Sequence, residues 1–315
     1  SPLGWVSWTD IVDEWLKANN RAKKGDKRGL KKFVNTRLAE AFEEQGTQVE
    51  LEYLEKRREY YEADVPDGVL VLVAGIDTQD DRLECVILGF GLEKEMWAIE
   101  YKQLMGDTTQ TAVWQQLDEY LNRKWAFKDG REIGISCTCI DSGGHSTSEV
   151  YHYCKPREHK RIFAVKGRGG EGVPLVGKYS RSNKMNVALF PVGDDEAKTL
   201  ILSRLMVDQE GEGYIHFPRN KEKGFDTEYF KGLVSEKKVK KYVKGHLKFE
   251  WIKEAGVRNE PIDTMKYGLA ALEILNPNFQ VIKRFFDENK DFYKHDQANK
   301  GTSGGRKKII SKGIS

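Results

Sequence analysis

The strongest constraint on the fold of this chain is the segment VLVLVAGIDTQDDRLECVILGFG at residues 69–91. An apolar run from Val69 to Ile76 ends on Asp77, and a second apolar run follows after a short polar turn. Runs of this kind are typical of buried strands. A carboxylate at the tip of a buried strand needs a partner that stabilises its charge, and a metal ion is one such partner. We therefore expect other element ends to bring further carboxylates to the same point.

Length and composition indicate a globular chain with a substantial core. The 315 residues are 39% hydrophobic and 32% charged, which suffices for one large domain or two modest ones. The net charge of +3 is small, but the positive residues come in blocks. No stretch approaches the roughly 18 apolar residues of a membrane span, and the first residues lack the layout of a signal peptide. We expect an intracellular chain whose four cysteines are reduced thiols.

The hydrophobic period divides the chain into three parts. Residues 1–66 are polar and helical in pattern, a linker or N-terminal extension that ends at the turn Pro66-Asp67-Gly68. Residues 67–280 form the main domain, and residues 281–315 form a flexible basic tail. Within the main domain, strands are predicted at 69–77, 82–91, 95–101, 133–141, 161–167, 186–193 and 213–218, a hairpin at 237–253, and helices at 107–125, 146–155, 194–207 and 259–275.

The order of these elements predicts an α/β fold. Three strands joined by short polar turns indicate antiparallel hairpins, and the alternation of helices and strands that follows indicates parallel strands. We therefore expect a mixed central sheet flanked by helices.

Three aspartates stand at the ends of elements in this scheme. Asp77 ends the first strand, and Asp141 ends the strand at 133–141, just before two glycines. Asp263 lies in the first turn of the helix at 259–275, where the helix dipole favours an anion. Each alone is most simply a turn or cap residue. Together they favour a site for hard divalent cations, which prefer carboxylate oxygens.

These residues carry a resemblance to a known family. The motifs AGIDTQDDRLE…WAIEY, CIDSGGH and RNEPIDTMKYGLAALEIL, in this order, resemble the nuclease domain of the large terminase subunit of lambda-type tailed phages. The resemblance covers residues 5 to about 277. It implies a ribonuclease H-like fold for residues 67–280 and metal-dependent cutting of double-stranded concatemeric DNA during viral genome packaging in the host cytoplasm.

The resemblance also implies site residues, cofactors and partners. Asp77, Asp141 and Asp263 match the three acids of the family site and would hold two Mg²⁺ or Mn²⁺ ions, with Asp77 bridging both. The expected partners are double-stranded DNA, the small terminase subunit and the portal protein of the procapsid, the last through the C-terminal tail. A packaging ATPase domain is expected on the full-length chain.

One phosphate-loop motif is a decoy. The segment GVPLVGKYS at 172–180 has the Gly-x₄-Gly-Lys spacing, but Tyr179 stands where Ser or Thr should hold Mg²⁺. No apolar strand leads directly into Gly172, and no convincing helix follows Lys178. An ATPase motor is therefore disfavoured for this chain.

Two basic segments are candidate DNA contacts. A mobile surface loop and lysines that protect a hairpin edge explain the same residues equally simply. The candidates are Lys166, Arg168, Lys178, Arg181, Lys184, Lys238, Lys240 and Lys241.

Two residues are candidates for outer positions around the metals. His145 follows Asp141 by four residues, and Asp80 lies in the turn after Asp77. His145 is equally well explained as an ordinary loop histidine, and Asp80 is most simply a turn residue. A zinc site is rejected, because the Cys-x-Cys spacing of Cys137 and Cys139 on a strand fits no usual zinc knuckle.

Two alternative functions stay open at the level of sequence. Another ribonuclease H-like nuclease, of the junction resolvase or integrase type, would carry a similar set of acids. A catalytically silent DNA-binding or docking module would use the basic blocks and keep the acids as structural residues. Metal-dependent nicking of plasmid DNA separates the silent module from both enzymes.

Overall fold

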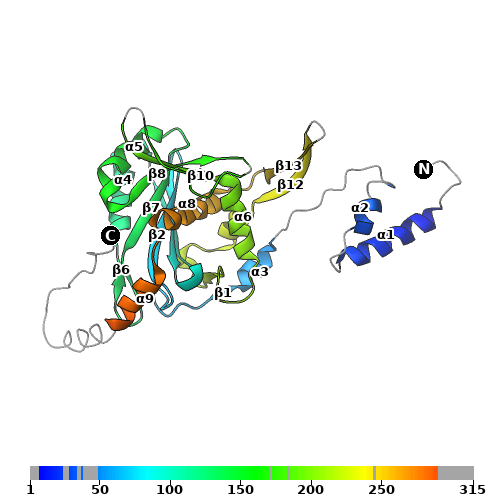
Figure 1. Cartoon of the computed structure of the whole chain (residues 1–315), viewed down its shortest axis with the longest axis horizontal. Coiled ribbons are helices and arrows are strands. Elements are labelled where there is room, and N and C mark those ends of the chain that lie inside the picture. The colour runs from blue at the N-terminus through cyan, green and yellow to red at the C-terminus, as the bar shows by residue number, and fades with distance from the viewer. Residues whose placement is uncertain are drawn as a thin grey trace. The chain divides into compact units, whose positions relative to one another are not determined.

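The computed structural model of the chain describes residues 7–23, 28–33, 37, 49–170, 172–182, 185–243 and 246–289 (Figure 1). Two compact units emerge from the contacts between residues. The smaller unit comprises residues 1–48 and 236–252, and the larger one comprises residues 49–235 and 253–315.

The helices are α1 (Trp8–Lys23), α2 (Arg28–Phe33), α3 (Leu51–Lys56), α4 (Thr111–Asn122), α5 (Thr147–Cys154), α6 (Asp194–Leu205), α7 (Thr227–Leu233), α8 (Glu260–Leu275) and α9 (Phe279–Glu288). Short 3-10 segments lie at η2 (Leu92–Lys94), η3 (Lys155–Lys160) and η4 (Lys221–Lys223). The strands are β1 (Arg58–Glu59), β2 (Val71–Thr78), β3 (Arg82–Phe90), β4 (Met96–Met105), β5 (Trp125–Ala126), β6 (Glu132–Ile133), β7 (Ile135–Asp141), β8 (Ile162–Arg168), β9 (Ser180–Arg181), β10 (Ala188–Gly193), β11 (Ile215–Pro218), β12 (Glu236–Val243) and β13 (His246–Lys253).

The larger unit is built on one mixed sheet with the strand order β1-β11-β4-β3-β2-β7-β8-β10-β9. Strands β2, β3 and β4 are antiparallel neighbours, as the short polar turns between them predict. Strands β7, β8 and β10 then run parallel to β2. The predicted α/β class with a mixed central sheet flanked by helices is therefore confirmed.

Alternation along the strands divides the core into two layers. On one face, Val71, Val73 and Cys139 pack with side chains of α6, α7 and α8. On the other, Leu72 and Ile76 pack with side chains of α4 and α5. Because side chains alternate along a strand, Asp77 and Asp141 share the face of their odd-numbered neighbours, the face covered by α8.

Helix α8 is the central helix of the unit. Most of its residues from Pro261 to Leu272 are buried, which suits a helix that is apolar nearly all round. Pro261 stands in its first turn, and Asn276 ends it in the left-handed conformation (φ 43°). A Cβ atom on Gly75 of β2 would overlap the carbonyl oxygen of Thr264 and the amide nitrogen of Gly268. Glycine at position 75 therefore lets the helix backbone lie directly against the strand.

The N-terminal boundary differs from the predicted one near residue 66. The charged helix expected to continue to residue 62 ends at Lys56, and Arg58–Glu59 form a strand that pairs in parallel with β11. The larger unit accordingly begins at Val49, which is buried together with Leu54. Pairing with a distant strand overrides the local helical preference here.

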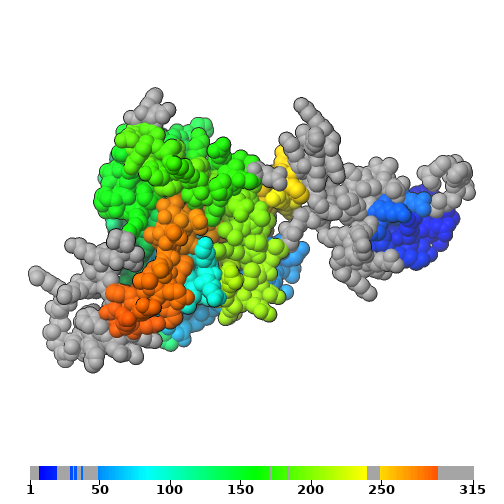
Figure 2. Space-filling view, in the orientation of Figure 1, coloured from blue at the N-terminus to red at the C-terminus, as the bar shows by residue number. Residues whose placement is uncertain are grey.

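The C-terminal boundary also differs. Residues 281–288, predicted to belong to a flexible tail, are helical: α9 occupies Phe279–Glu288 and is capped by Asn278, which accepts a hydrogen bond from the amide of Val281. Ile282 of this helix is buried, and Phe286 packs against Phe127. The helix lies on the surface of the larger unit at the orange-red end of the colour scale (Figure 2). Residues 290–315 lie outside the described residues.

The smaller unit contains α1, α2 and the hairpin of β12 with most of β13. The hairpin predicted at 237–253 is confirmed. Several apolar side chains of α1 are exposed, among them Trp8 and Val12. Among the helices that the structure describes, none is long and apolar enough to cross a membrane.

Replacement of Gly75 by alanine is expected to destabilise the larger unit. The added methyl group has no space between β2 and the backbone of α8, so the free energy of unfolding should fall by about 3 kcal/mol or more, the upper end of overpacking costs. Urea unfolding followed by circular dichroism measures this change. Gly169→Ala is the matched control, because no atom lies within 4 Å of a Cβ at that position. Equal unfolding midpoints for the two variants would contradict the close contact.

Candidate active site

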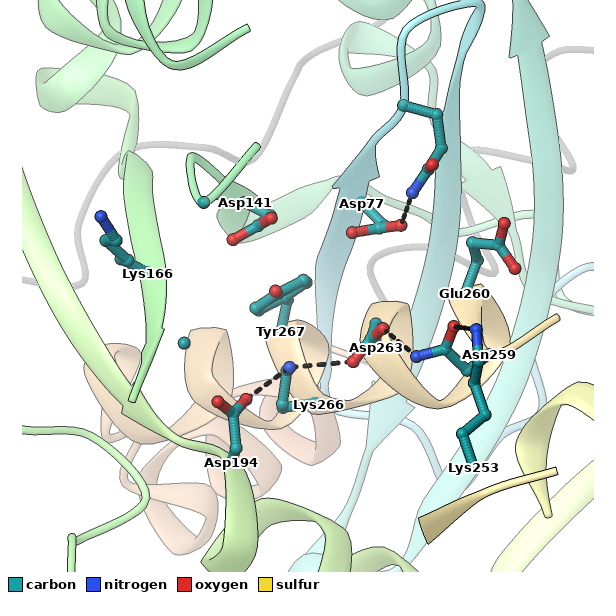
Figure 3. Close-up of a pocket in the computed structure, with 13 residues that line it drawn as sticks. Asp77, Asp141, Lys166, Asp194, Lys253, Asn259, Glu260, Asp263, Lys266 and Tyr267 are labelled. Atoms are coloured by element: carbon teal, nitrogen blue, oxygen red, sulfur yellow. Dashed lines mark hydrogen bonds and ion pairs between the residues drawn. The ribbon is translucent and has the colours of Figure 1, made fainter. Parts of the chain in front are cut away.

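A cavity of about 460 Å³ opens where the ends of β2 and β7 meet the first turns of α8 (Figure 3). Its lining is polar and rich in charge. The lining residues are Asp77, Gln79, Asp141, Gly143, Lys166, Gly167, Asp194, Lys253, Asn259, Glu260, Asp263, Lys266 and Tyr267.

The structure brings the three predicted aspartates to this one cavity. Asp77 lies near the end of β2 opposite Glu84 of β3, and Asp141 is the last residue of β7. Asp263 comes from the first turn of α8. The hydroxyl of Thr78 donates to the carbonyl oxygen of Asp141 at 3.1 Å and so fastens the two strand ends to each other.

Burial and mutual repulsion perturb these acids strongly. Asp77 is only 5% exposed. Burial, followed by the charges of Asp263 and Asp141, raises the pKa of Asp77 to about 8, although Gln79 donates a hydrogen bond of 2.5 Å to its carboxylate. Burial also raises the pKa of Asp141, against the opposing effects of a hydrogen bond from Tyr267 and the charge of Lys266.

A buried lysine lies between two of the acids in the cavity. The Lys266 ammonium is 2.6 Å from Oδ1 of Asp194 and 2.9 Å from Oδ1 of Asp263 (Figure 3). Burial lowers its pKa, but the two aspartates outweigh burial and the pKa is raised. Asn259 donates to the other oxygen of Asp263 at 2.9 Å. Lys266 and Asn259 therefore fix the direction of the Asp263 carboxylate.

A second charged network holds the start of α8 against the sheet. Glu84 is fully buried and accepts hydrogen bonds from Arg82 at 2.6 Å, from Tyr101 and from Arg258. Arg82 reaches on to Glu260, the first residue of α8, at 2.9 Å. The position of Asp263 thus depends on β3 as well as on β2.

The donor set of the cavity suits a divalent cation. Three carboxylates from separate elements offer the hard oxygen ligands that Mg²⁺ and Mn²⁺ prefer, and their repulsion would be relieved by a cation. In the described part of the chain, the oxygen atoms of these three carboxylates lie farther apart than the ligand atoms of Glu59, Glu210 and His216. The latter all lie within 4.8 Å of one another.

Four of the eight predicted basic residues lie on described segments from β8 to β9, and they differ in their surroundings. Lys166 lines the cavity, as does Lys253, which the sequence did not single out. Arg168 and Lys178 are exposed and lie outside the lining. Arg181 pairs with Glu158 at 2.6 Å.

The remaining basic candidates lie on segments that are only partly described. Lys184 lies outside the described residues, as do the side chains of Lys240 and Lys241. The ammonium of Lys238 lies 5.4 Å from the ring centroid of Phe249, on the neighbouring strand of the hairpin.

The outer candidates His145 and Asp80 contact each other rather than the cavity. Their nearest polar atoms are 3.5 Å apart, and the side chains are 93% and 79% exposed. Neither lines the cavity.

Two further interpretations of the sequence agree with the structure. The four cysteines are buried, as expected of cysteines in or beside apolar runs. The described part of the segment 172–180 leads into strand β9 rather than a helix, as expected of a false phosphate loop.

Sequence reasoning missed several residues of the cavity, above all Asp194 and Lys266. Asp194 directly follows strand β10 and opens α6. This pattern, an acid at the end of an apolar strand, is the one that identified Asp77 and Asp141. Lys266 carried no such signal, because a lysine in a predicted amphipathic helix is normally assigned to its solvated face.

Comparison with known proteins places the chain in a family. A model of the endonuclease domain of the terminase large subunit gpA matches residues 1–284. The chain is 36% identical over 284 residues to the terminase large subunit of Escherichia phage lambda, and 33% identical over 283 residues to that of Enterobacteria phage P21. Each alignment covers 88% of this chain and 43% of the relative, so the chain spans less than half the length of these proteins.

The crystal structure of the HK97 bacteriophage large terminase is similar with a TM-score of 0.34 and 14% identity, over 85% of this chain and 52% of that one. That likeness is too weak to add to the description of the fold. The match over residues 1–284 and the two relatives show that the chain belongs to the family of the endonuclease domain of the terminase large subunit gpA.

Proposed function

We propose that this chain is a metal-dependent endonuclease that cuts double-stranded concatemeric DNA during viral genome packaging. The observation that supports this most strongly is the convergence of Asp77, Asp141 and Asp263 on one polar cavity, with the pKa of Asp77 raised to about 8. Buried acids that repel one another are costly for folding, and such perturbed groups cluster at functional sites. Membership of a terminase endonuclease family gives the reaction class.

We infer that the core of the sheet is ribonuclease H-like. The support is the strand order β4-β3-β2-β7-β8, in which three antiparallel strands are followed by strands parallel to β2. In this arrangement the C-terminal ends of the parallel strands β2 and β7 lie side by side, and α8 packs across these strands on one face of the sheet (Figure 1).

The proposed roles of the acids follow from their positions. Asp77 is shared between two sites, with Asp141 completing one and Asp263 the other. Two Mg²⁺ or Mn²⁺ ions held there would activate a water and stabilise the leaving oxygen of a phosphodiester. Lys266 forms ion pairs with both Asp263 and Asp194 and so orients their carboxylates. Tyr267 orients the carboxylate of Asp141 through its hydrogen bond.

Two lysines on the lining of the cavity are suited to hold DNA. Lys166 lies in the last three residues of β8 and lines the cavity with the aspartates, and Lys253 ends β13. Contacts of ammonium groups with phosphates supply affinity without reading sequence. We propose that both lysines bind the DNA backbone on either side of the scissile phosphate.

The wider assembly is proposed from the relatives. Both are terminase large subunits more than twice as long as the aligned part of this chain. We propose that the complete protein carries a packaging ATPase domain, works in the host cytoplasm, and meets the small terminase subunit and the portal protein.

Substitution of Asp77 by asparagine is expected to abolish metal-dependent cutting. The change keeps the shape of the side chain but removes the shared charge, so nicking of supercoiled plasmid in Mn²⁺ or Mg²⁺ should fall at least about 100-fold, the scale of a lost transition-state interaction. Asp208→Asn, on an exposed loop, is the matched control and should nick like the unmodified chain. Nicking by Asp77→Asn at the control rate would show that cutting does not depend on the three-aspartate site, and absence of nicking by the unmodified chain would favour the silent DNA-binding or docking module.

Removal of the buried ammonium group of Lys266 is expected to destabilise the chain when no metal is bound. Lys266→Met leaves Asp194 and Asp263 without their shared partner, which should lower the free energy of unfolding by about 3–5 kcal/mol. Addition of Asp194→Asn to this variant should restore part of the loss. Urea unfolding in EDTA measures both effects.

The control for that series is Lys283→Met, which removes an exposed salt bridge with Asp287 and should cost less than about 1 kcal/mol. If Lys266→Met unfolded at the same urea concentration as the control, the buried lysine would not be the counter-charge of the acids.

Substitution of Lys166 by alanine is expected to weaken DNA binding. Loss of one phosphate contact should reduce the slope of log K against log salt by about 1, uniformly across DNA sequences. The affinity is measured by titration of a fluorescent duplex with protein that also carries Asp77→Asn, so that the DNA is not cut during the measurement. Arg181→Ala is the comparison, and its effect should be smaller because Arg181 is already paired with Glu158. A larger loss of DNA binding in Arg181→Ala than in Lys166→Ala would indicate that the DNA binds away from the cavity.

A further inference from the structure

A second group of ligating side chains lies outside the cavity, at the edge of the sheet that carries β1. His216 of β11 is its centre, and the His216 ring is buried between two aromatic rings. It stacks on Trp97 with ring centroids 4.8 Å apart and planes at 3°, and it meets Tyr214 edge-on at 4.6 Å. The plane of the imidazole is therefore fixed before any ligand binds.

Both ring nitrogens face carboxylates. Nε2 is 3.0 Å from Oε1 of Glu95, and the same oxygen accepts the amide of Gly211 at 2.9 Å. Nδ1 is 2.8 Å from Oε1 of Glu59. A neutral imidazole has one N–H and can satisfy only one of these carboxylates. The other nitrogen then needs either a second proton or a cation between it and its carboxylate.

A third carboxylate favours the cation. Ligand atoms of Glu59, Glu210 and His216 all lie within 4.8 Å of one another, so the exposed Glu210 lies beside the same imidazole as Glu59. With Glu95, three carboxylates therefore lie around one imidazole. Carboxylates held this close repel one another unless positive charge lies between them.

The guanidinium groups recorded near this edge do not supply that charge. Arg57 donates to the carbonyl oxygen of Leu205 and lies over the ring of Tyr214, with two of its nitrogens buried and without a hydrogen-bond partner. Arg204 donates to the carbonyl oxygen of Lys94. In the described part of the chain, neither is paired with Glu59, Glu95 or Glu210.

We propose that Glu59, Glu210 and Nδ1 of His216 form a second metal site, separate from the nuclease cavity, for a Zn²⁺-class ion. One imidazole nitrogen and two carboxylate oxygens suit such an ion, and three protein ligands leave a fourth position for water. Glu95 accepts the Nε2 proton and so holds the ring in the tautomer that presents Nδ1. Mg²⁺, which prefers oxygen ligands alone, is the wrong ion for this site.

The site would join three segments that are distant in sequence. Glu59 lies on the two-residue strand β1, Glu210 on the loop after α6, and His216 on β11. An ion shared among them fastens β1, the outermost strand, to the sheet. Its role is structural and independent of the proposed nuclease chemistry.

The test is a titration of metal-stripped Asp77→Asn chain with Zn²⁺ in excess Mg²⁺, with a chromophoric chelator as competitor. This background lowers binding at the nuclease cavity, so a failed nuclease assignment does not affect the result. We expect one Zn²⁺ per chain. Addition of Glu210→Gln should weaken its affinity at least about tenfold, the lower end of the loss from a metal-site substitution. Addition of Glu212→Gln, a neighbouring exposed acid, should leave it unchanged.

Glu59→Gln provides an independent second variant and should weaken Zn²⁺ binding as Glu210→Gln does. Circular dichroism of each variant, metal-free, checks that the fold is retained. The proposal is overturned if the chain binds no Zn²⁺ under these conditions, or if the Glu210 and Glu212 variants bind it equally well. His216 would then be an imidazolium clamped between Glu59 and Glu95.

Discussion

The geometry of the cavity depends on one backbone contact, the approach of α8 to β2 at Gly75. No side chain separates the strand from the helix there, because a Cβ would overlap the backbone of Thr264 and Gly268. Asp77 lies two residues after Gly75 on the same face of the sheet, and Asp263 immediately precedes Thr264. The spacing of these two acids is therefore set by backbone packing and not by flexible side chains, which is the kind of support a preorganised site needs.

The same closeness creates an electrostatic cost that the rest of the cavity offsets. Asp77, Asp141 and Asp263 are held together where water is scarce, and burial with repulsion raises the pKa of Asp77. Lys266, buried in α8, supplies a positive charge that is shared with Asp194. A core helix that is otherwise apolar thus carries one lysine on the side that faces the acids. Unfavourable charge of this sort is retained where a function requires it.

The sequence predicted the central strands and the aspartates of this site better than the elements at the two ends of the unit. Strong apolar runs with short turns identify β2, β3 and β4, and strand alternation assigns Asp77 and Asp141 to one face. Strand β1 could not be predicted, because two residues in a charged segment become a strand only through pairing with β11, more than 150 positions away. Helix α9 was assigned to the tail although its sequence FQVIKRFFDE has the apolar spacing of an amphipathic helix, because the residues around it are polar.

The prediction of the residues that line the cavity meets the same limit, because contacts between distant elements are not visible in the sequence. An acid after an apolar run is visible in the sequence, and Asp194 carried that signal as clearly as Asp141. The partnership of Asp194 with Lys266 is not visible, since it depends on which face of α8 meets which strand end. The metal-binding roles of the three aspartates and the ribonuclease H-like class stay proposals, supported by position and charge.

The attachment of β1 along the outer edge of the sheet has a mechanical consequence. Tension that reaches this unit from residues before Val49 passes through α3 into β1, whose parallel partner β11 is itself parallel to β4. The load is thus borne by hydrogen bonds and side chains at the edge, with β4 and β3 between that edge and β2. A pull on the upstream segment therefore meets β1, β11, β4 and β3 before it reaches β2, the strand that carries Asp77.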